Sequence, residues 1–294
     1  MPSPSRRYHP RVTFSIVARS ADGLLHGVAV ASKFLAAGAL VPAAEAEVGA
    51  LASQAHANLA FRSQGLAMLR TGVPAAGVVA GLVAADPGRD DRQLGVVGAR
   101  GDGATWTGPR CHPWAGGQSG DGWAAQGNIL AGPEVIDALR DAWLGGADLP
   151  FPQRLLAALA AGDRAGGDRR GRQSAALFVV QRHGGYAGTG DELVDLRVDD
   201  HRDPVGELGR LLDIHTLLFG KPDPATLLDL TGSVADEVAA LLAAAGHPVG
   251  AAGVEEALDA WAGVENLEER IVPGRIDPVV LDHLRRATAP ATGG

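Results

Sequence analysis

The sequence has little cysteine and few aromatic residues, and each shortage excludes a class of protein. The single cysteine, Cys111, excludes an intrachain disulfide and a zinc cluster built on cysteines. Aromatic residues make up only 4% of the 294 residues, so the core must be built from closely packed Ala, Val and Leu. No apolar run reaches the roughly 18 residues that a membrane-spanning helix needs, so no contact with a membrane is expected.

Positive charge is also scarce. Lys33 and Lys221 are the only lysines, and the net charge is −8. Beyond residue 220 the chain holds twelve acidic and five basic residues. Nucleic-acid binding needs a basic surface, so this charge balance argues against a nucleic-acid partner. The histidines show no HxH or HExxH spacing, so we expect no metal and no other cofactor.

The first twelve residues differ from the rest of the chain. They carry Arg6, Arg7 and Arg11 but no apolar segment, so they do not read as a secretory signal. We therefore expect residues 1–12 to form a flexible extension and the protein to be cytoplasmic.

The hydrophobic pattern from residue 13 to residue 216 predicts a mixed α+β domain. Helices are predicted at 62–70, 75–85, 133–143, 152–161 and 204–215. Strands are predicted at 13–19, 26–32, 49–57, 93–99, 104–107, 123–128, 173–181 and 193–199. Because strand hairpins and helices come in groups, we expect a layered, largely antiparallel sheet architecture instead of a Rossmann fold.

Residues 221–288 read as a separate small helical domain. Short helices are predicted at 225–230, 233–245, 253–264 and 278–287. Ser233 and Asp277 are the expected N-caps, and Pro278 follows Asp277 at the first helical position.

Six blocks of sequence, in order, resemble one family. The blocks are TFSIVAR from residue 13, GVAVAS from 27, SQAHAN from 53, ADPGRDDRQLGVV from 85, QGNILAG from 126 and GGDRRGRQSAAL from 166. They are similar to the DUF1028 family, which is grouped with the Ntn (N-terminal nucleophile) hydrolases. The resemblance implies a four-layer αββα sandwich of the Ntn-hydrolase type. It also implies that Thr13 is a nucleophile whose own free α-amine acts as the base, since an α-amine has a reference pKa of roughly 7.7–8.0.

Thr13 follows twelve residues, so its amine is free only if these are absent. Val12 is one possible start, read from a GTG codon as Met and then removed. Self-cleavage between Val12 and Thr13 is the second possibility. In the third, Thr13 is an ordinary strand residue without catalytic use.

Polar residues in otherwise apolar strands are the next candidates for the site. Asn128 and Gln126 are the expected oxyanion donors, and Ser32 and Gln54 are expected at the pocket, either toward substrate or as internal support. Lys33, directly after a strand close to Thr13, either lowers the pKa of the nucleophile or lies at the surface.

A loop rich in glycine and arginine precedes the strand at 173–181. In this loop Asp168 and Arg172 are expected to orient an anionic substrate, with Ser174 at the strand mouth. The alternatives are a solvated loop or a subunit contact made by arginine. A Cys111–His112 nucleophile pair is disfavoured, because neighbours on a strand point to opposite faces.

The blocks GVEEALDAWAGVENLEER from residue 253 and IDPVVLDHLR from 276 resemble a peptidoglycan-binding domain. That resemblance implies a peptidoglycan-like ligand, which conflicts with a cytoplasmic location; a protein partner, a helical lid or a dimerisation element are the other interpretations. The leading hypothesis is hydrolysis of an amide C–N bond in a small-molecule substrate by a homo-oligomer. A non-catalytic binding protein and a structural oligomer are the alternatives.

Overall fold

The computed structural model describes residues 13–289, which form two compact units. The division falls after Leu212, within helix α6 (Pro204–Phe219). The predicted extension, residues 1–12, lies outside the described residues. Each unit has its own hydrophobic core, so each is described by itself.

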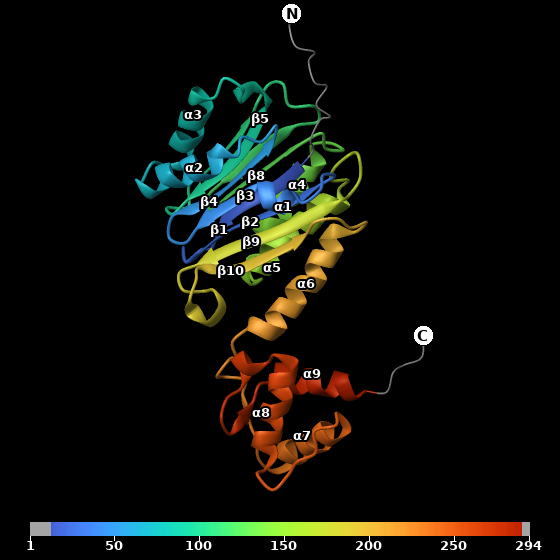
Figure 1. Ribbon diagram of the computed structural model, residues 1–294. Helices are drawn as coiled ribbons and strands as arrows, with labels where there is room; N and C mark the ends of the chain where they lie inside the picture. The colour runs from blue at the N-terminus through green and yellow to red at the C-terminus, as the bar shows by residue number, and fades with distance from the viewer. Residues whose placement is uncertain (1–12, 290–294) are drawn as a thin grey trace, which may run out of the picture. The chain divides into compact units, whose positions relative to one another are not determined.

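Two antiparallel sheets form the centre of the first unit (Figure 1). Sheet A has the strand order β10-β9-β2-β1-β8-β7, and sheet B has the order β3-β4-β5-β6. The strands of sheet A are β1 (Thr13–Arg19), β2 (Leu25–Ser32), β7 (Gly116–Gly120), β8 (Trp123–Asn128), β9 (Ser174–Gln181) and β10 (Glu192–Val198). Those of sheet B are β3 (Pro42–Glu45), β4 (Gly49–Ala55), β5 (Arg92–Gly98) and β6 (Gly103–Thr107).

Helices cover the outer face of each sheet. The pair α4 (Glu134–Gly145) and α5 (Phe151–Arg164) packs on sheet A, whereas α2 (Ala60–Arg70) and α3 (Ala75–Ala85) pack on sheet B. The inner faces of the two sheets contact each other, β1 against β4 and β8 against β5. The order of layers is therefore helix, sheet, sheet, helix, which confirms the α+β sandwich expected from the sequence.

Side-chain alternation on β1 shows why the layers form. Phe14, Ile16 and Ala18 belong to the core shared with α4 and α5. Val17, on the opposite face, belongs to the core between the sheets, which is built from valine and alanine. The shortage of aromatic residues predicted a core of such small side chains, which let two sheets pack closely.

The predicted elements are mostly confirmed, with differences where a segment lacks its own signal. The structure adds β3, β7 and the short helix α1 (Ala37–Leu40), none of which was predicted. β7, with the sequence GGQSG, is an edge strand that exists because its backbone pairs with β8.

The second unit is helical, as expected. It contains α7 (Gly232–Ala244), α8 (Val254–Glu265) and α9 (Pro278–Thr288), packed around the buried Trp261. The prediction of a helix at 225–230 is wrong, since Leu228–Asp229 forms strand β11 and pairs with β12 (Arg275–Ile276).

The two predicted N-caps of this unit have different outcomes. Asp277 caps α9, its side chain accepting a hydrogen bond from the Val279 N–H. Ser233 is not a cap, because α7 already begins at Gly232, after Thr231.

Candidate active site

Thr13 lies at the end of β1, a central strand of sheet A between β2 and β8. Its side chain is 4% exposed and faces the space between the two sheets, where its Oγ1 lies 3.2 Å from the Ser32 Oγ on β2. On the other side of β1, Asn128 of the neighbouring strand β8 is the register partner of Thr13. Three of the residues predicted for the site therefore converge at one end of the inter-sheet layer.

The carbonyl oxygen of Thr13 is held by amide side chains from both sheets. The Gln54 Nε2 donates to it at 3.2 Å, and the Asn128 Nδ2 lies at 3.5 Å, the limit of a hydrogen bond. Both amides also donate to the Gln93 Oε1, each at 2.9 Å. Because these groups are buried and partnered, the main chain of Thr13 has a fixed position.

The network continues one step deeper into the sandwich. Ser15 donates to the Gln54 Oε1 at 2.6 Å and accepts from the Gln126 Nε2 at 2.7 Å. Gln126 is fully buried and packs against Gly95, where a Cβ would lie 1.9 Å from its Oε1. Gln126 thus lies in the internal network beside Ser15, whereas Asn128 lies beside Thr13.

Backbone strain gathers at the same end of the sandwich. Ala55 directly follows Gln54 with φ of 61°, and Ile129 directly follows Asn128 with φ of 50°. Ile129 is β-branched, and such a residue with positive φ is an outlier. Ala36, directly before α1, also has a positive φ, of 52°. Strained backbone of this kind clusters at functional sites, which marks this end of the fold.

Asp168 braces the end of β2. Its side chain, 2% exposed, accepts from the Lys33 N–H at 2.6 Å and from the Arg170 N–H at 2.9 Å, and pairs with the Arg170 guanidinium at 3.3 Å. The Lys33 side chain is exposed and donates to the Arg172 carbonyl oxygen at 3.3 Å. Asp168 therefore acts on the backbone next to Ser32.

Arg172 and Ser174 are both engaged within the fold. The Arg172 Nε donates to both oxygens of Asp163 at 2.9 Å, and this interaction raises the pKa of the guanidinium. The Ser174 hydroxyl donates to the Phe34 carbonyl oxygen at 2.6 Å and accepts from the Ala37 N–H at 3.1 Å. Ser174 thereby clamps the turn that joins β2 to α1.

A small cavity of about 20 Å³ opens beside Thr13. By volume it holds roughly one water molecule or one methyl group. The residues around it are Thr13, Phe34, Ala37, Leu40, Val41, Gln54, Ala55 and Ala57.

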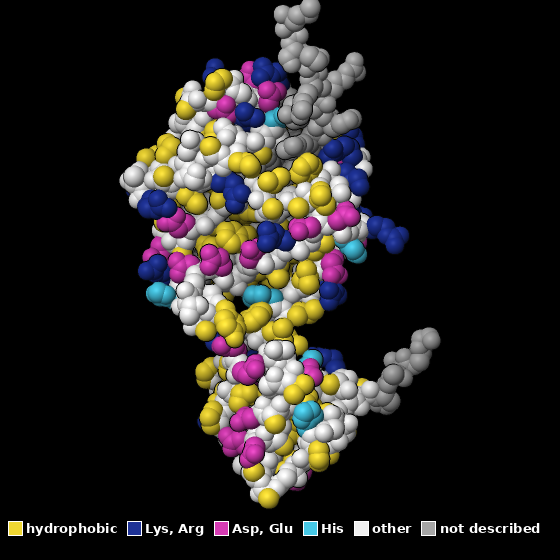
Figure 2. Space-filling view, viewed as in Figure 1, with side chains coloured by type: hydrophobic (Ala, Val, Ile, Leu, Met, Phe, Trp, Pro, Cys, Tyr) yellow, Lys and Arg dark blue, Asp and Glu magenta, His cyan; other side chains and the backbone are white. Residues whose placement is uncertain are grey.

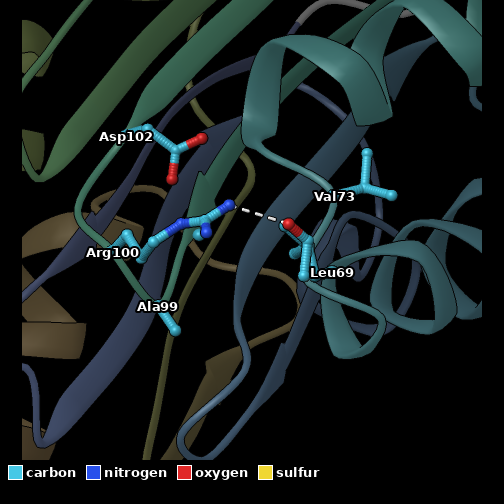
Figure 3. A pocket seen from close by; sticks show the side chains of 7 residues that line it. Leu69, Val73, Ala99, Arg100 and Asp102 are labelled. Carbon is cyan, nitrogen blue, oxygen red and sulfur yellow. Dashed lines mark hydrogen bonds between the residues drawn. The ribbon is translucent and has the colours of Figure 1, made fainter.

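A larger hollow of about 130 Å³ lies at the other end of sheet B (Figure 3). Its charged side chains already bind backbone: Arg100 donates to the Gly72 carbonyl oxygen at 2.7 Å, and Asp102 accepts from the Ala75 N–H at the start of α3. These contacts fix the turn between α2 and α3. The charged side chains of this hollow therefore serve the fold, and the Thr13 end is the better candidate for an active site.

Cys111 has no nucleophilic character in this environment. Burial raises the pKa of its thiol to about 11, so little thiolate exists at neutral pH. Its neighbour His112 is exposed.

Figure 2 shows acidic and basic side chains interspersed over the visible face of the first unit.

Gln93 and Ser15 are the polar members of this site that sequence reasoning missed. Each is a polar residue in an apolar strand, the same signal that identified Gln54 and Asn128.

Among residues 13–289, no group of three or more His, Cys, Asp or Glu side chains could hold a metal ion. None of the helices in this range has the length and apolar character needed to cross a bilayer.

Comparison with known proteins gives a family match for each unit. Residues 13–208 match the model of a family of unknown function, DUF1028, and residues 218–284 match a "putative peptidoglycan binding domain". The crystal structure of a Silicibacter pomeroyi protein of the same DUF1028 family is similar to this chain, with 30% identity and a TM-score of 0.63. The match covers 76% of this chain and 92% of that one. No curated protein matches.

Proposed function

Because the chain belongs to the DUF1028 family, whose function is unknown, we propose its activity from the surroundings of Thr13: hydrolysis of an amide bond in a small metabolite. Thr13 is the nucleophile, and its α-amine, once free, is the base. The observation that supports this most directly is a buried threonine hydroxyl beside a cavity, at the end of the sandwich where the strained residues Ala36, Ala55 and Ile129 gather. The four-layer order agrees with the Ntn-hydrolase sandwich that the family resemblance implies.

The proposed reaction has two steps. The Thr13 Oγ1 attacks the amide carbonyl carbon, its proton passes to the α-amine and then to the leaving nitrogen, and an ester with Thr13 remains. Water then cleaves the ester, so an amide and water become an acid and an amine. The Ser32 hydroxyl, 3.2 Å from the Thr13 Oγ1, is placed to pass the proton.

Asn128 is the proposed donor to the negative oxygen of the intermediate. One of its two amide N–H groups is used by Gln93, while the other makes only the 3.5 Å contact to the Thr13 carbonyl and is weakly committed. In the same proposal Asp168 is a positioning residue, because it holds the backbone beside Ser32.

The mass of the intact purified protein tests the first requirement, since an active chain must begin at Thr13. Thr13→Ala should lower hydrolysis of small amides at least about a thousandfold, as loss of a nucleophile does. Thr13→Ser should retain activity, and Thr189→Ala, in the exposed loop after β9, serves as the matched control. An active chain that keeps residues 1–12, or an active Thr13→Ala variant, would rule out this mechanism.

A second proposed function is binding. The match of residues 218–284 favours a peptidoglycan-like ligand for the second unit, with a protein partner as the other occupant. Sedimentation of the protein with purified peptidoglycan tests it, and binding that survives deletion of residues 218–284 would contradict it. A cytoplasmic location and a homo-oligomer remain parts of the proposal, to be tested by fractionation and light scattering.

A further inference from the structure

The cavity beside Thr13 has a chemical character that bears on the substrate. Apart from Thr13 and Gln54, every described residue around it is apolar: Phe34, Ala37, Leu40, Val41, Ala55 and Ala57. It lies at the end of the alanine- and valine-rich core between the sheets, to which Ala37 and Val41 belong.

Gln54 adds no donor toward this cavity. Its Nε2 has two hydrogens and three acceptors within 3.3 Å, which are the Gln93 Oε1 and the carbonyl oxygens of Thr13 and Gln126. Its Oε1 accepts from Ser15. The amide is therefore committed to the protein, and a charged substrate group in this cavity would find no partner there.

The nearby charges form a separate set. A very small hollow of about 10 Å³ next to Ser32 contains Asp163, Asp168 and Arg172. The carboxylates are already paired, Asp163 with Arg172 and Asp168 with Arg170. This set offers no net charge with which to select an anionic substrate.

The walls of the apolar cavity are fixed. Ser174 bonds both ends of the turn from Phe34 to Ala37, and the strained residues Ala36 and Ala55 set the backbone on either side. A volume of about 20 Å³ between these walls has room for one methyl-sized group.

We propose that this cavity is the acyl pocket of the enzyme, and that it selects an uncharged acyl group whose substituent is methyl-sized. The inference rests on the proposed function, because it takes Thr13 as the residue that is acylated. The scissile carbonyl then lies at the Thr13 hydroxyl, the methyl-sized substituent enters the cavity, and the leaving amine faces outward.

The test uses the full-length purified protein, its first residue established by intact mass. It is treated with the p-nitrophenyl esters of acetate, propionate, butyrate, valerate and succinate. Transfer of the acyl group to Thr13 releases p-nitrophenol, and peptide mass spectrometry locates the ester. We expect acetate or propionate to react fastest, with at least a roughly tenfold decline per added methylene and little reaction of the anionic succinyl ester.

Leu40→Ala enlarges the cavity and should move the optimum to butyrate or valerate. Leu59→Ala, which removes a leucine that is 51% exposed, is the matched control and should keep the wild-type order of esters. A preference for succinate, a flat profile, or no shift in Leu40→Ala, each with Thr13 acylated, would overturn the acyl pocket and leave the nucleophile standing. Absence of any ester on Thr13 would overturn the proposed function itself.

Discussion

His26 makes the fold sensitive to acid, because its side chain is buried in the first unit. It lies on β2 with 0% exposure, and neither ring nitrogen has a hydrogen-bond partner among residues 13–289. Burial, with a smaller contribution from the nearby positive charge of Arg19, lowers the pKa of the imidazole from 6.5 to about 4. The folded protein therefore keeps His26 neutral over a range in which the unfolded chain binds a proton.

The sign and size of the effect follow from this difference. Above pH 6.5 the imidazole is neutral in both states and has no effect. As the pH falls from 6.5 toward 4, only the unfolded chain gains the proton, so the free energy of unfolding decreases. With the two pKa values of 6.5 and about 4, the loss between pH 7 and pH 5 is about 2 kcal/mol.

Urea unfolding at pH 7, 6 and 5 measures this loss. Tryptophan fluorescence reports mainly on the first unit, which holds four of the five tryptophans. His26→Leu should remove about 2 kcal/mol of the pH dependence, while carboxylates common to both proteins cancel in the comparison. His112→Leu, at an exposed position, should keep the wild-type dependence. Equal pH dependence in wild type and His26→Leu would refute the reasoning.

Two further predictions concern packing and charge. Gly95→Ala should destabilise the first unit by about 1–3 kcal/mol in thermal unfolding, because the added methyl group overlaps the Gln126 amide; Gly145→Ala, which has open space around it, should not destabilise it. Arg270→Met should destabilise the second unit by about 3–5 kcal/mol, because it leaves Asp277 buried without its 2.6 Å partner. Hydrogen exchange should locate the lost stability in α7–α9. Adding Asp277→Asn to Arg270→Met should restore part of the lost stability. Loss of exchange protection in the first unit would contradict the prediction.

Sequence periodicity predicted those elements whose burial is regular. β1 and β9 alternate or run apolar because each lies inside the sandwich, so their residues record the fold. β3 has the sequence PAAE, and its strand form comes from pairing with β4. β11 likewise depends on β12, more than forty residues later in the chain, which no local pattern encodes.

The candidate site was predictable in its members but not in their partners. Polar residues in apolar strands identified Gln54 and Asn128, because buried amides need hydrogen bonds. Which group each amide binds depends on the register between two sheets, so Gln93 could not be assigned. Arg172 is a similar case, since its carboxylate partner, Asp163, comes from the last turn of α5.

The hydrogen-bonded amides between the sheets also fix the alignment of one sheet over the other. An apolar interface of alanine and valine alone would tolerate a shift of one sheet over the other, since small side chains pack almost equally well in several positions. The bonds that Gln54 and Gln93 of sheet B make to Thr13, Ser15 and Asn128 of sheet A require one alignment of the two sheets. We expect a sandwich in which Gln54 and Gln93 were replaced by apolar residues to lose the single alignment that brings Thr13, Ser32 and Asn128 to one point.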